Sequence, residues 1–262
     1  MSTPSKSLAA MRSTAPLVQC ITNYVAMNFQ ANVLLAAGAA PAMVHDPEEA
    51  GEFAAIAPAV SINIGTLSPR WVDGMLEAAS MAGKTNTPWV LDPVACFATG
   101  LRRDATSKLM QAGPSILRGN ASEILAIAGE DTAGSGVDAG DTVSAAEEAA
   151  RKIAKASNCI VAVTGETDFV TDGERAVHVS GGSALMPQVT ATGCSLSALC
   201  GAYAAAIDDK FDATVGALSH FAAAGEAAAA KVEGPGGFAA AFLDALAAVT
   251  PETIGNERVT PA

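Results

Sequence analysis

The sequence predicts an α/β fold of three layers, in which helices cover both faces of a central, mainly parallel sheet. Short apolar runs that end in Gly, Pro or Asp alternate with helical patterns along the 262 residues. Half of the residues are hydrophobic, 16% are charged and 24 are glycines, which is typical of a folded α/β domain with close helix packing. No shift of composition, repeat or linker divides the chain, so we expect a single domain over residues 1–262.

Five apolar runs predict the parallel strands, at residues 40–44, 59–64, 88–92, 115–118 and 159–164. Helical patterns accompany them at residues 24–37, 47–56, 69–82, 103–112, 121–128 and 141–156. Alternation of this kind implies parallel βαβ units and therefore a sheet that is covered on both faces.

The second half of the chain departs from this alternation. Residues 168–190 contain an Asp-Gly turn followed by alternating residues, which predicts antiparallel strands at a sheet edge. Three helices are expected after them, at residues 193–207, 212–231 and 237–248. The last 14 residues are predicted to form a tail.

Charge and cysteine usage narrow the functional class. A formal net charge of -12 argues against nucleic acid and against an anionic membrane surface as partners. Five scattered cysteines without a CxxC pair argue against a disulfide framework and a zinc site. The N-terminus lacks an apolar core of signal-peptide length, and no strongly apolar run reaches about 18 residues. We therefore expect a cytoplasmic protein.

Ligands of open parallel sheets bind at the carboxyl ends of the strands, so the residues that follow the strands are candidates for chemistry. Asp92 ends the run 88–92, where it is either a functional carboxylate or the start of an ordinary turn. Thr164 ends the run 159–164, and its hydroxyl either contacts a nucleotide phosphate or belongs to a simple turn. The residues alone leave both alternatives open.

The turn Ala191-Thr192-Gly193-Cys194 runs directly into a helical pattern. Backbone N–H groups at a helix start are unpaired and attract anions, so these four residues suit the charge of a phosphoryl group in transfer. A thiol at a helix N-terminus tends to have a lowered pKa, so Cys194 is a candidate to hold or accept the proton of an attacking alcohol, or to shape the site. The alternative is an ordinary turn of small residues around a buried cysteine.

The segment 116–129 offers a second candidate. Asn120 begins a helix and Glu123 stands three residues later, which is the spacing of a capping pair. The same spacing allows Glu123 to help hold hydrated Mg²⁺ near phosphates, with Arg118 as the phosphate partner. Both interpretations remain open at this point.

Other signals carry less weight. Residues 134–139 match a GxGxxG/A pattern but follow a helix and a loop instead of a strand, and no P-loop motif occurs. The three histidines, His45, His178 and His220, are not spaced as metal ligands or as members of a triad.

In combination, RGNASEI at 118–124 and TGC at 192–194 before a helix resemble the hydroxyethylthiazole kinase family of thiamine biosynthesis, within the ribokinase-like superfamily. The resemblance extends over about residues 15–248, which we take as the core of the domain. It implies a ribokinase-like fold and the transfer of phosphate from ATP, with Mg²⁺, to the hydroxyl of 4-methyl-5-(2-hydroxyethyl)thiazole. It also implies a homotrimer with active sites between subunits.

The resemblance further implies roles for individual residues. Positions that contact the thiazole correspond to Met43 and Gly193, and Asn23 lies in a stretch that lines the same pocket. ATP-binding positions correspond to Arg118 and Thr164. The acidic positions that organise Mg²⁺ and the phosphates correspond to Asp92 and Glu123, and Cys194 stands where many ribokinase-like relatives carry an Asp base.

Two departures from the family pattern matter. Ala191 replaces the first Gly of TGTGC, which is strained if the position needs a positive φ. Phe97 stands in DPVACFAT (92–99), where the family reads DPVGAGAT, and brings bulk where a Gly allows close approach. They leave two alternatives open: a kinase of another heteroaromatic alcohol such as a hydroxymethylpyrimidine, or a thiazole- or nucleotide-binding protein with impaired catalysis.

Overall fold

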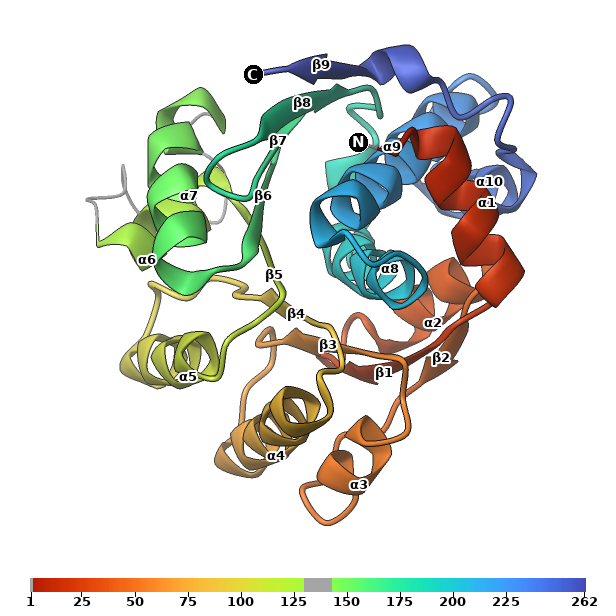
Figure 1. Ribbon diagram of the computed structural model, residues 1–262. Coiled ribbons are helices and arrows are strands. Elements are labelled where there is room, and N and C mark those ends of the chain that lie inside the picture. The colour runs from red at the N-terminus through yellow and green to blue at the C-terminus, as the bar shows by residue number, and fades with distance from the viewer. Residues whose placement is uncertain (1, 130–142) are drawn as a thin grey trace.

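The sheet is the centre of the computed structural model, which describes residues 2–129 and 143–262. Within these residues nine strands form one sheet in the order β2-β1-β3-β4-β5-β6-β7-β8-β9 (Figure 1). Strands β1 to β6 pair in parallel, and β7, β8 and β9 are added antiparallel at one edge. The predicted α/β class with a mainly parallel sheet is confirmed.

The strands are β1 (Leu17–Ile21), β2 (Ala40–Ala42), β3 (Ala59–Asn63), β4 (Trp89–Asp92), β5 (Ile116–Asn120), β6 (Ile160–Thr164), β7 (Thr167–Thr171), β8 (Ala176–Ser180) and β9 (Val259–Pro261). The α-helices are α1 (Pro4–Thr14), α2 (Met27–Ala37), α3 (Ala50–Ala54), α4 (Pro69–Thr85), α5 (Gly100–Gln111), α6 (Ala121–Ala128), α7 (Val143–Ser157), α8 (Thr192–Ala206), α9 (Lys210–Ala229) and α10 (Pro235–Ala248).

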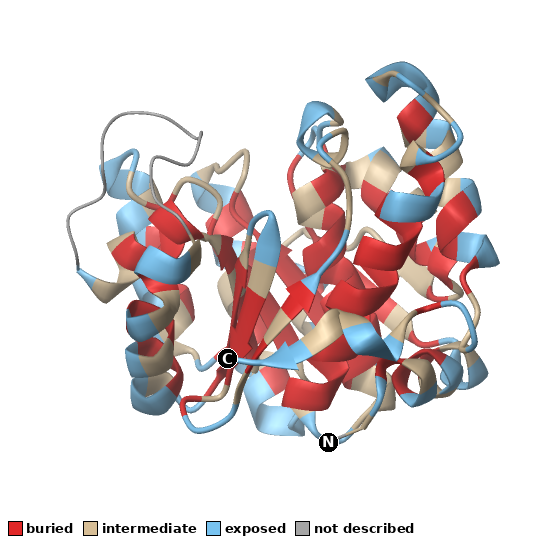
Figure 2. Cartoon of the chain, turned by 90° about the horizontal axis from the view of Figure 1, so that it is seen from above, coloured by how far each residue is buried: buried red, intermediate tan, exposed pale blue. Residues whose placement is uncertain are grey.

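The helices form two layers, one on each face of the sheet. Helices α1, α2, α8, α9 and α10 lie on one face, and α3 to α7 lie on the other (Figure 1). Each layer closes its own hydrophobic core, with Tyr203, Phe211 and Phe238 in the first and Trp89 in the second. The strands between them are buried over most of their length (Figure 2). Burial on both faces explains why the strands appear in the sequence as continuous apolar runs.

Among the described α-helices and strands, α1, β1 and β9 were not predicted. Strand β1 carries the fully buried Gln19, whose side-chain amide donates to the carbonyls of Val44 and Ala50. This polar residue interrupts the apolar run. Helix α1 begins at Thr3, whose side chain accepts from the N–H of Lys6, and buries one stripe of apolar side chains. Strand β9 pairs with β8, so the prediction of a C-terminal tail is wrong.

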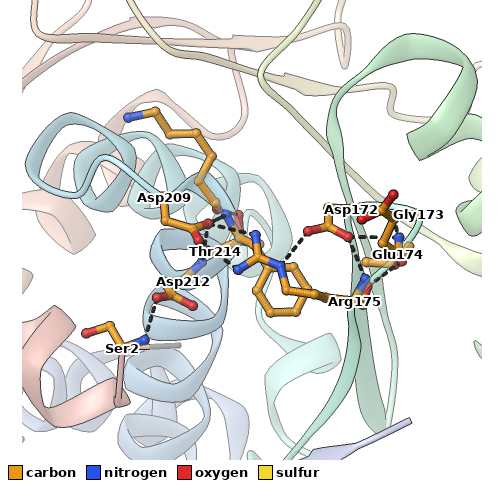
Figure 3. Close-up of polar contacts among 11 residues, drawn as sticks. Ser2, Asp172, Gly173, Glu174, Arg175, Asp209, Asp212 and Thr214 are labelled. Atoms are coloured by element: carbon orange, nitrogen blue, oxygen red, sulfur yellow. Dashed lines mark hydrogen bonds and ion pairs between the residues drawn. The ribbon is translucent and has the colours of Figure 1, made fainter.

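The predicted antiparallel hairpin is confirmed as β7 and β8, with Gly173 in its turn at φ 94°. Beside this turn Arg175 donates to Asp172 and, through both Nη atoms, to Asp209 (Figure 3). Asp209 also caps α9 by accepting from the N–H groups of Phe211 and Asp212. The hairpin and the start of α9 are thereby joined.

None of the described helices is long and apolar enough to cross a membrane. The five cysteines are unpaired, as expected. The GxGxxG/A match at 134–139, and residues 141–142 of the expected helix 141–156, lie outside the described residues.

Candidate active site

The carboxyl ends of the parallel strands meet the N-terminus of α8. Asn23 follows β1, Asn63 ends β3, Asp92 ends β4, and Thr164 ends β6. Arg118 of β5 reaches the start of α8, since a Cβ atom on Gly193 would lie 3.0 Å from its Nη1 atom. Segments separated by more than 150 residues thus come together where sheets of this type bind ligands.

Helix α8 begins without a side-chain cap. Its N-cap residue is Ala191, whose side chain has no oxygen to accept a hydrogen bond. Helices α4, α5, α6 and α9 are instead capped by Ser68, Thr99, Asn120 and Asp209, whose side chains accept from N–H groups of the first turn. The first N–H groups of α8, from Thr192 to Cys194, have no acceptor within the helix. Unpaired N–H groups of this kind attract anions, and the sequence predicts an anion site at this turn.

Asp92 is a buried carboxylate with defined partners. Its side chain is 1% exposed, and its Oδ2 accepts a hydrogen bond of 2.8 Å from Ser197 Oγ. The same oxygen lies 3.7 Å from Arg118 Nη1. Burial raises the pKa of Asp92, and the Arg118 charge and the hydrogen bond from Ser197 oppose that rise. Asp92 is therefore a carboxylate of the interior and not a turn residue at the surface.

Glu123 forms the capping pair that its spacing allowed, and its other oxygen has a partner outside the helix. Asn120 Oδ1 accepts from the Glu123 N–H, and Glu123 Oε2 accepts from the Asn120 N–H, each at 2.9 Å, which completes a capping box. Its Oε1 accepts from the N–H of Ala95 at 2.9 Å. The pKa of Glu123 is raised to about 7, mainly by burial and secondly by the charge of Asp92. The effect of the Asp92 charge on Glu123 indicates that the two carboxyl groups lie near each other.

Arg118 links the acidic groups to β6. Its Nη1 faces Asp92, and its Nη2 donates to Thr164 Oγ1. The Thr164 hydroxyl lies 3.3 Å from the carbonyl of Gly119. A guanidinium held beside an uncapped helix N-terminus forms a strongly anion-attracting location, and its fork geometry suits phosphate oxygens.

Cys194 faces two asparagines, and its acidity differs from the expectation. Asn23 Nδ2 lies 3.4 Å from Cys194 Sγ and 2.8 Å from Asn63 Oδ1. The pKa of the Cys194 thiol is raised to about 11, mainly by burial and secondly by the charge of Asp92. The predicted lowering of its pKa is wrong because these two effects exceed the lowering by Asn23, Arg118 and Asn63. The thiol is protonated at neutral pH.

Both family glycines that this chain replaces with alanine near the site have left-handed backbone. Ala191 has φ 68° and Ala95 has φ 51°. The strain anticipated for Ala191 is therefore present, and a second strained alanine donates the N–H that holds Glu123. Phe97 packs against the second core, on the side of helices α3 to α7, and lines a cavity of ≈ 680 Å³ together with Met110 and Ile127. Its bulk is accommodated between helices.

The contacts bring together Asn23, Asp92, Arg118, Glu123, Thr164, Gly193 and Cys194, with Ala191 and Thr192 in the same turn. Met43 follows β2 and packs, partly buried, against the first core, and it is not among the residues that these contacts bring together. Sequence reasoning missed Ser197, Asn63 and Ala95. Ser197 had no signal, because its partner Asp92 is 105 residues away, whereas the position of Asn63 at a strand end was a usable signal.

Comparisons with known proteins agree with this geometry. Residues 8–252 match the model of the hydroxyethylthiazole kinase family. The chain belongs to the hydroxyethylthiazole kinase family. A family member from Rhizobium johnstonii, a hydroxyethylthiazole kinase, is 63% identical over 96% of this chain and 95% of its own.

Solved structures extend the comparison. The structure of a hydroxyethylthiazole kinase protein from Pyrococcus horikoshii has a TM-score of 0.88 and 37% identity, and covers 96% of this chain and 95% of its own. A ribokinase-like superfamily protein from Enterococcus faecalis has a TM-score of 0.65 at 12% identity, over 92% of this chain and 89% of its own. The second likeness shows the fold alone, and the predicted ribokinase-like fold is confirmed.

Proposed function

We propose that this hydroxyethylthiazole kinase family member transfers the γ-phosphoryl group of ATP to the hydroxyl of 4-methyl-5-(2-hydroxyethyl)thiazole. The observation that carries the proposal is the meeting of Arg118, Asp92 and the uncapped start of α8 at the carboxyl edge of the sheet. Cation, carboxylate and unpaired N–H groups are what phosphoryl transfer needs, because its catalysis depends on positioning and on charge stabilisation.

Each group has a part in the proposed reaction. Arg118 and Thr164 bind phosphate oxygens of ATP. The N–H groups of residues 191–194 receive the charge of the phosphoryl group during transfer. The alcohol oxygen forms a bond to the γ-phosphorus while the bond to ADP breaks. Because the Cys194 thiol is protonated at neutral pH, we assign the alcohol proton to Asp92, whose raised pKa suits a general base.

The acidic pair fits Mg²⁺. No group of three or more His, Cys, Asp or Glu side chains among the described residues is arranged to hold a metal. Mg²⁺ in kinases is bound mostly by substrate phosphates and water, with one or two carboxylates. Asp92 and Glu123, whose pKa values are both raised by burial, supply that number. When bound, the ion would neutralise phosphate charge beside them.

Met43 and Asn23 belong to the proposed thiazole pocket, in a homotrimer whose sites lie between subunits. Tyr24 and Val25, directly after Asn23, are exposed to 68% and 59%, which supports contact with a neighbouring subunit there.

We treat residues 1–262 as one kinase domain. The five free cysteines and the use of ATP support a cytoplasmic location.

The test is an assay of purified protein with ATP, Mg²⁺ and a panel of alcohols. We expect ADP formation with the thiazole alcohol and slower turnover with a hydroxymethylpyrimidine. Phe97, the residue that raised the pyrimidine alternative, packs among helices and so gives no reason to expect a different alcohol. Faster turnover of the pyrimidine would favour the other alcohol kinase. Binding of the thiazole without turnover would favour an impaired enzyme, the alternative that the strained Ala191 raises.

A further inference from the structure

Asn63 is the last residue of β3, is 1% exposed, and has a fixed side-chain orientation. Its Oδ1 accepts from the N–H of Gly65 at 2.9 Å and from Asn23 Nδ2 at 2.8 Å. Only the oxygen end of an amide can accept two such donors. The Nδ2 group must therefore point away from Gly65 and Asn23.

That Nδ2 group is buried and has no hydrogen-bond partner among the described residues. A buried donor without an acceptor costs about 1 to 3 kcal/mol, so a protein keeps one where something else accepts the bond.

The surroundings of Asn63 are the groups assigned to the reaction. Asn63 is the register partner of Asp92 across β3 and β4. The Asn23 Nδ2 group that donates to Asn63 Oδ1 also lies 3.4 Å from Cys194 Sγ, so the Asn63 amide is close to the first turn of α8. The donor is thus directed at the region between Asp92 and the start of α8, where the proposed transfer takes place.

We propose that Asn63 Nδ2 donates a hydrogen bond to the alcohol oxygen of the substrate and holds it for attack on the γ-phosphorus. The inference rests on the proposed function and adds a residue in direct contact with the reacting atom. An alcohol oxygen has two lone pairs, so it can accept from Nδ2 with one while the other faces phosphorus. The same contact leaves its O–H free to donate towards Asp92.

The contact predicts discrimination between an alcohol and its deoxy analogue. We would titrate the wild-type protein with 4-methyl-5-(2-hydroxyethyl)thiazole and with 4-methyl-5-ethylthiazole, which lacks the hydroxyl, and measure both Kd values by calorimetry. A neutral hydrogen bond corresponds to about a fivefold to tenfold difference in affinity. We expect the alcohol to bind that much more tightly to the wild type.

Two variants remove the donor in different ways. Asn63→Asp keeps an acceptor for both Gly65 and Asn23, and Asn63→Ser can keep the turn bond to Gly65 without adding charge. We expect the ratio of the two Kd values to fall severalfold in a folded variant of either kind, and to stay above one because the hydroxyl still donates to Asp92. Asn32→Asp, the same exchange in a half-buried asparagine of α2, should keep the wild-type ratio.

The outcomes separate the two proposals. Wild-type phosphorylation of the alcohol with equal affinities for alcohol and deoxy analogue would overturn the role of Asn63. So would a wild-type ratio that survives in either folded Asn63 variant, as shown by an unchanged cooperative melting transition. Failure of the wild type to phosphorylate the alcohol would instead overturn the proposed function.

Discussion

Two alanines at the edge of the site have backbone conformations that L-residues disfavour. Ala191, with φ 68°, begins α8, and Ala95, with φ 51°, holds Glu123 through its N–H. A left-handed conformation costs about 1 to 2 kcal/mol for a residue with a Cβ atom. Strain of this size persists where the surroundings enforce it, as at functional sites.

We expect Ala191→Gly to raise the free energy of unfolding by about 0.5 to 1 kcal/mol, because the relief of strain exceeds the entropy that Gly adds to the unfolded chain. Turnover should change by no more than about threefold, because the amide geometry is retained. Urea unfolding and steady-state kinetics would measure both. Ala247→Gly, at an exposed position of α10, should instead destabilise the protein. A large gain in turnover would contradict this expectation and show that Ala191 impairs catalysis.

Ser197 orients Asp92 through a buried hydrogen bond of 2.8 Å. We expect Ser197→Ala to lower kcat by about tenfold, since a buried carboxylate loses a charge-assisted bond. Without that bond the pKa of Asp92 rises further, so the pH–rate profile should shift to higher pH. Ser219→Ala is the matched control, because Ser219 is equally buried and donates at 2.8 Å to the carbonyl of Val215. Equal kinetics in the two variants would refute the role of Ser197.

At the scale of elements, a buried polar chain joins three helices of one layer. Tyr203 OH of α8 lies 3.0 Å from His220 Nδ1 of α9, and His220 Nε2 lies 2.9 Å from the carbonyl of Leu246 in α10. The carbonyl can only accept, so Nε2 carries the hydrogen and Nδ1 accepts from the tyrosine. Burial lowers the pKa of His220 to about 4, and the folded protein therefore contains the neutral ring.

This histidine predicts acid sensitivity. The unfolded chain takes up a proton near pH 6.5 and the folded protein does not, so the stabilisation is present above pH 6.5 and is lost as the pH falls below it. At pH 5 the loss amounts to about 2 kcal/mol. Urea unfolding at pH 7 and pH 5 would measure it. The decrease should be smaller by about that amount in His220→Gln, and an equal decrease in both proteins would contradict the assignment.

At the scale of the whole molecule, the alternating apolar runs were sufficient to predict the layers, because buried parallel strands and amphipathic helices leave strong periodic signals. Strand β1 was not predicted, because the polar Gln19, whose amide is hydrogen-bonded inside the protein, interrupts its apolar run. Strand β9 was not predicted, because it is only three residues long. Site residues at strand ends were predictable in kind. Their pairing across more than 100 residues was not, and the acidity of Cys194 depended on burial that only the folded chain reveals.

The proposed trimer is also a property of the whole molecule. We expect light scattering to give three times the chain mass of 26.1 kDa. Replacing the exposed Tyr24 by Asp should shift the mass towards the monomer, because charge would enter an apolar contact. Ile56→Asp, at a residue exposed to 72%, is the control. A monomeric wild type would contradict the trimer.

The central claim is that phosphate moves where Arg118 meets the start of α8, and one pair of glycine variants tests it most directly. A Cβ atom on Gly193 would lie 3.0 Å from Arg118 Nη1, whereas one on Gly201, later in the same helix, would meet its neighbours no closer than 3.5 Å. We would measure the thiazole phosphate formed from ATP by mass spectrometry. We predict that Gly201→Ala forms product at the wild-type rate and that Gly193→Ala, with equal stability, is at least about tenfold slower. Equal rates in the two variants would contradict the account.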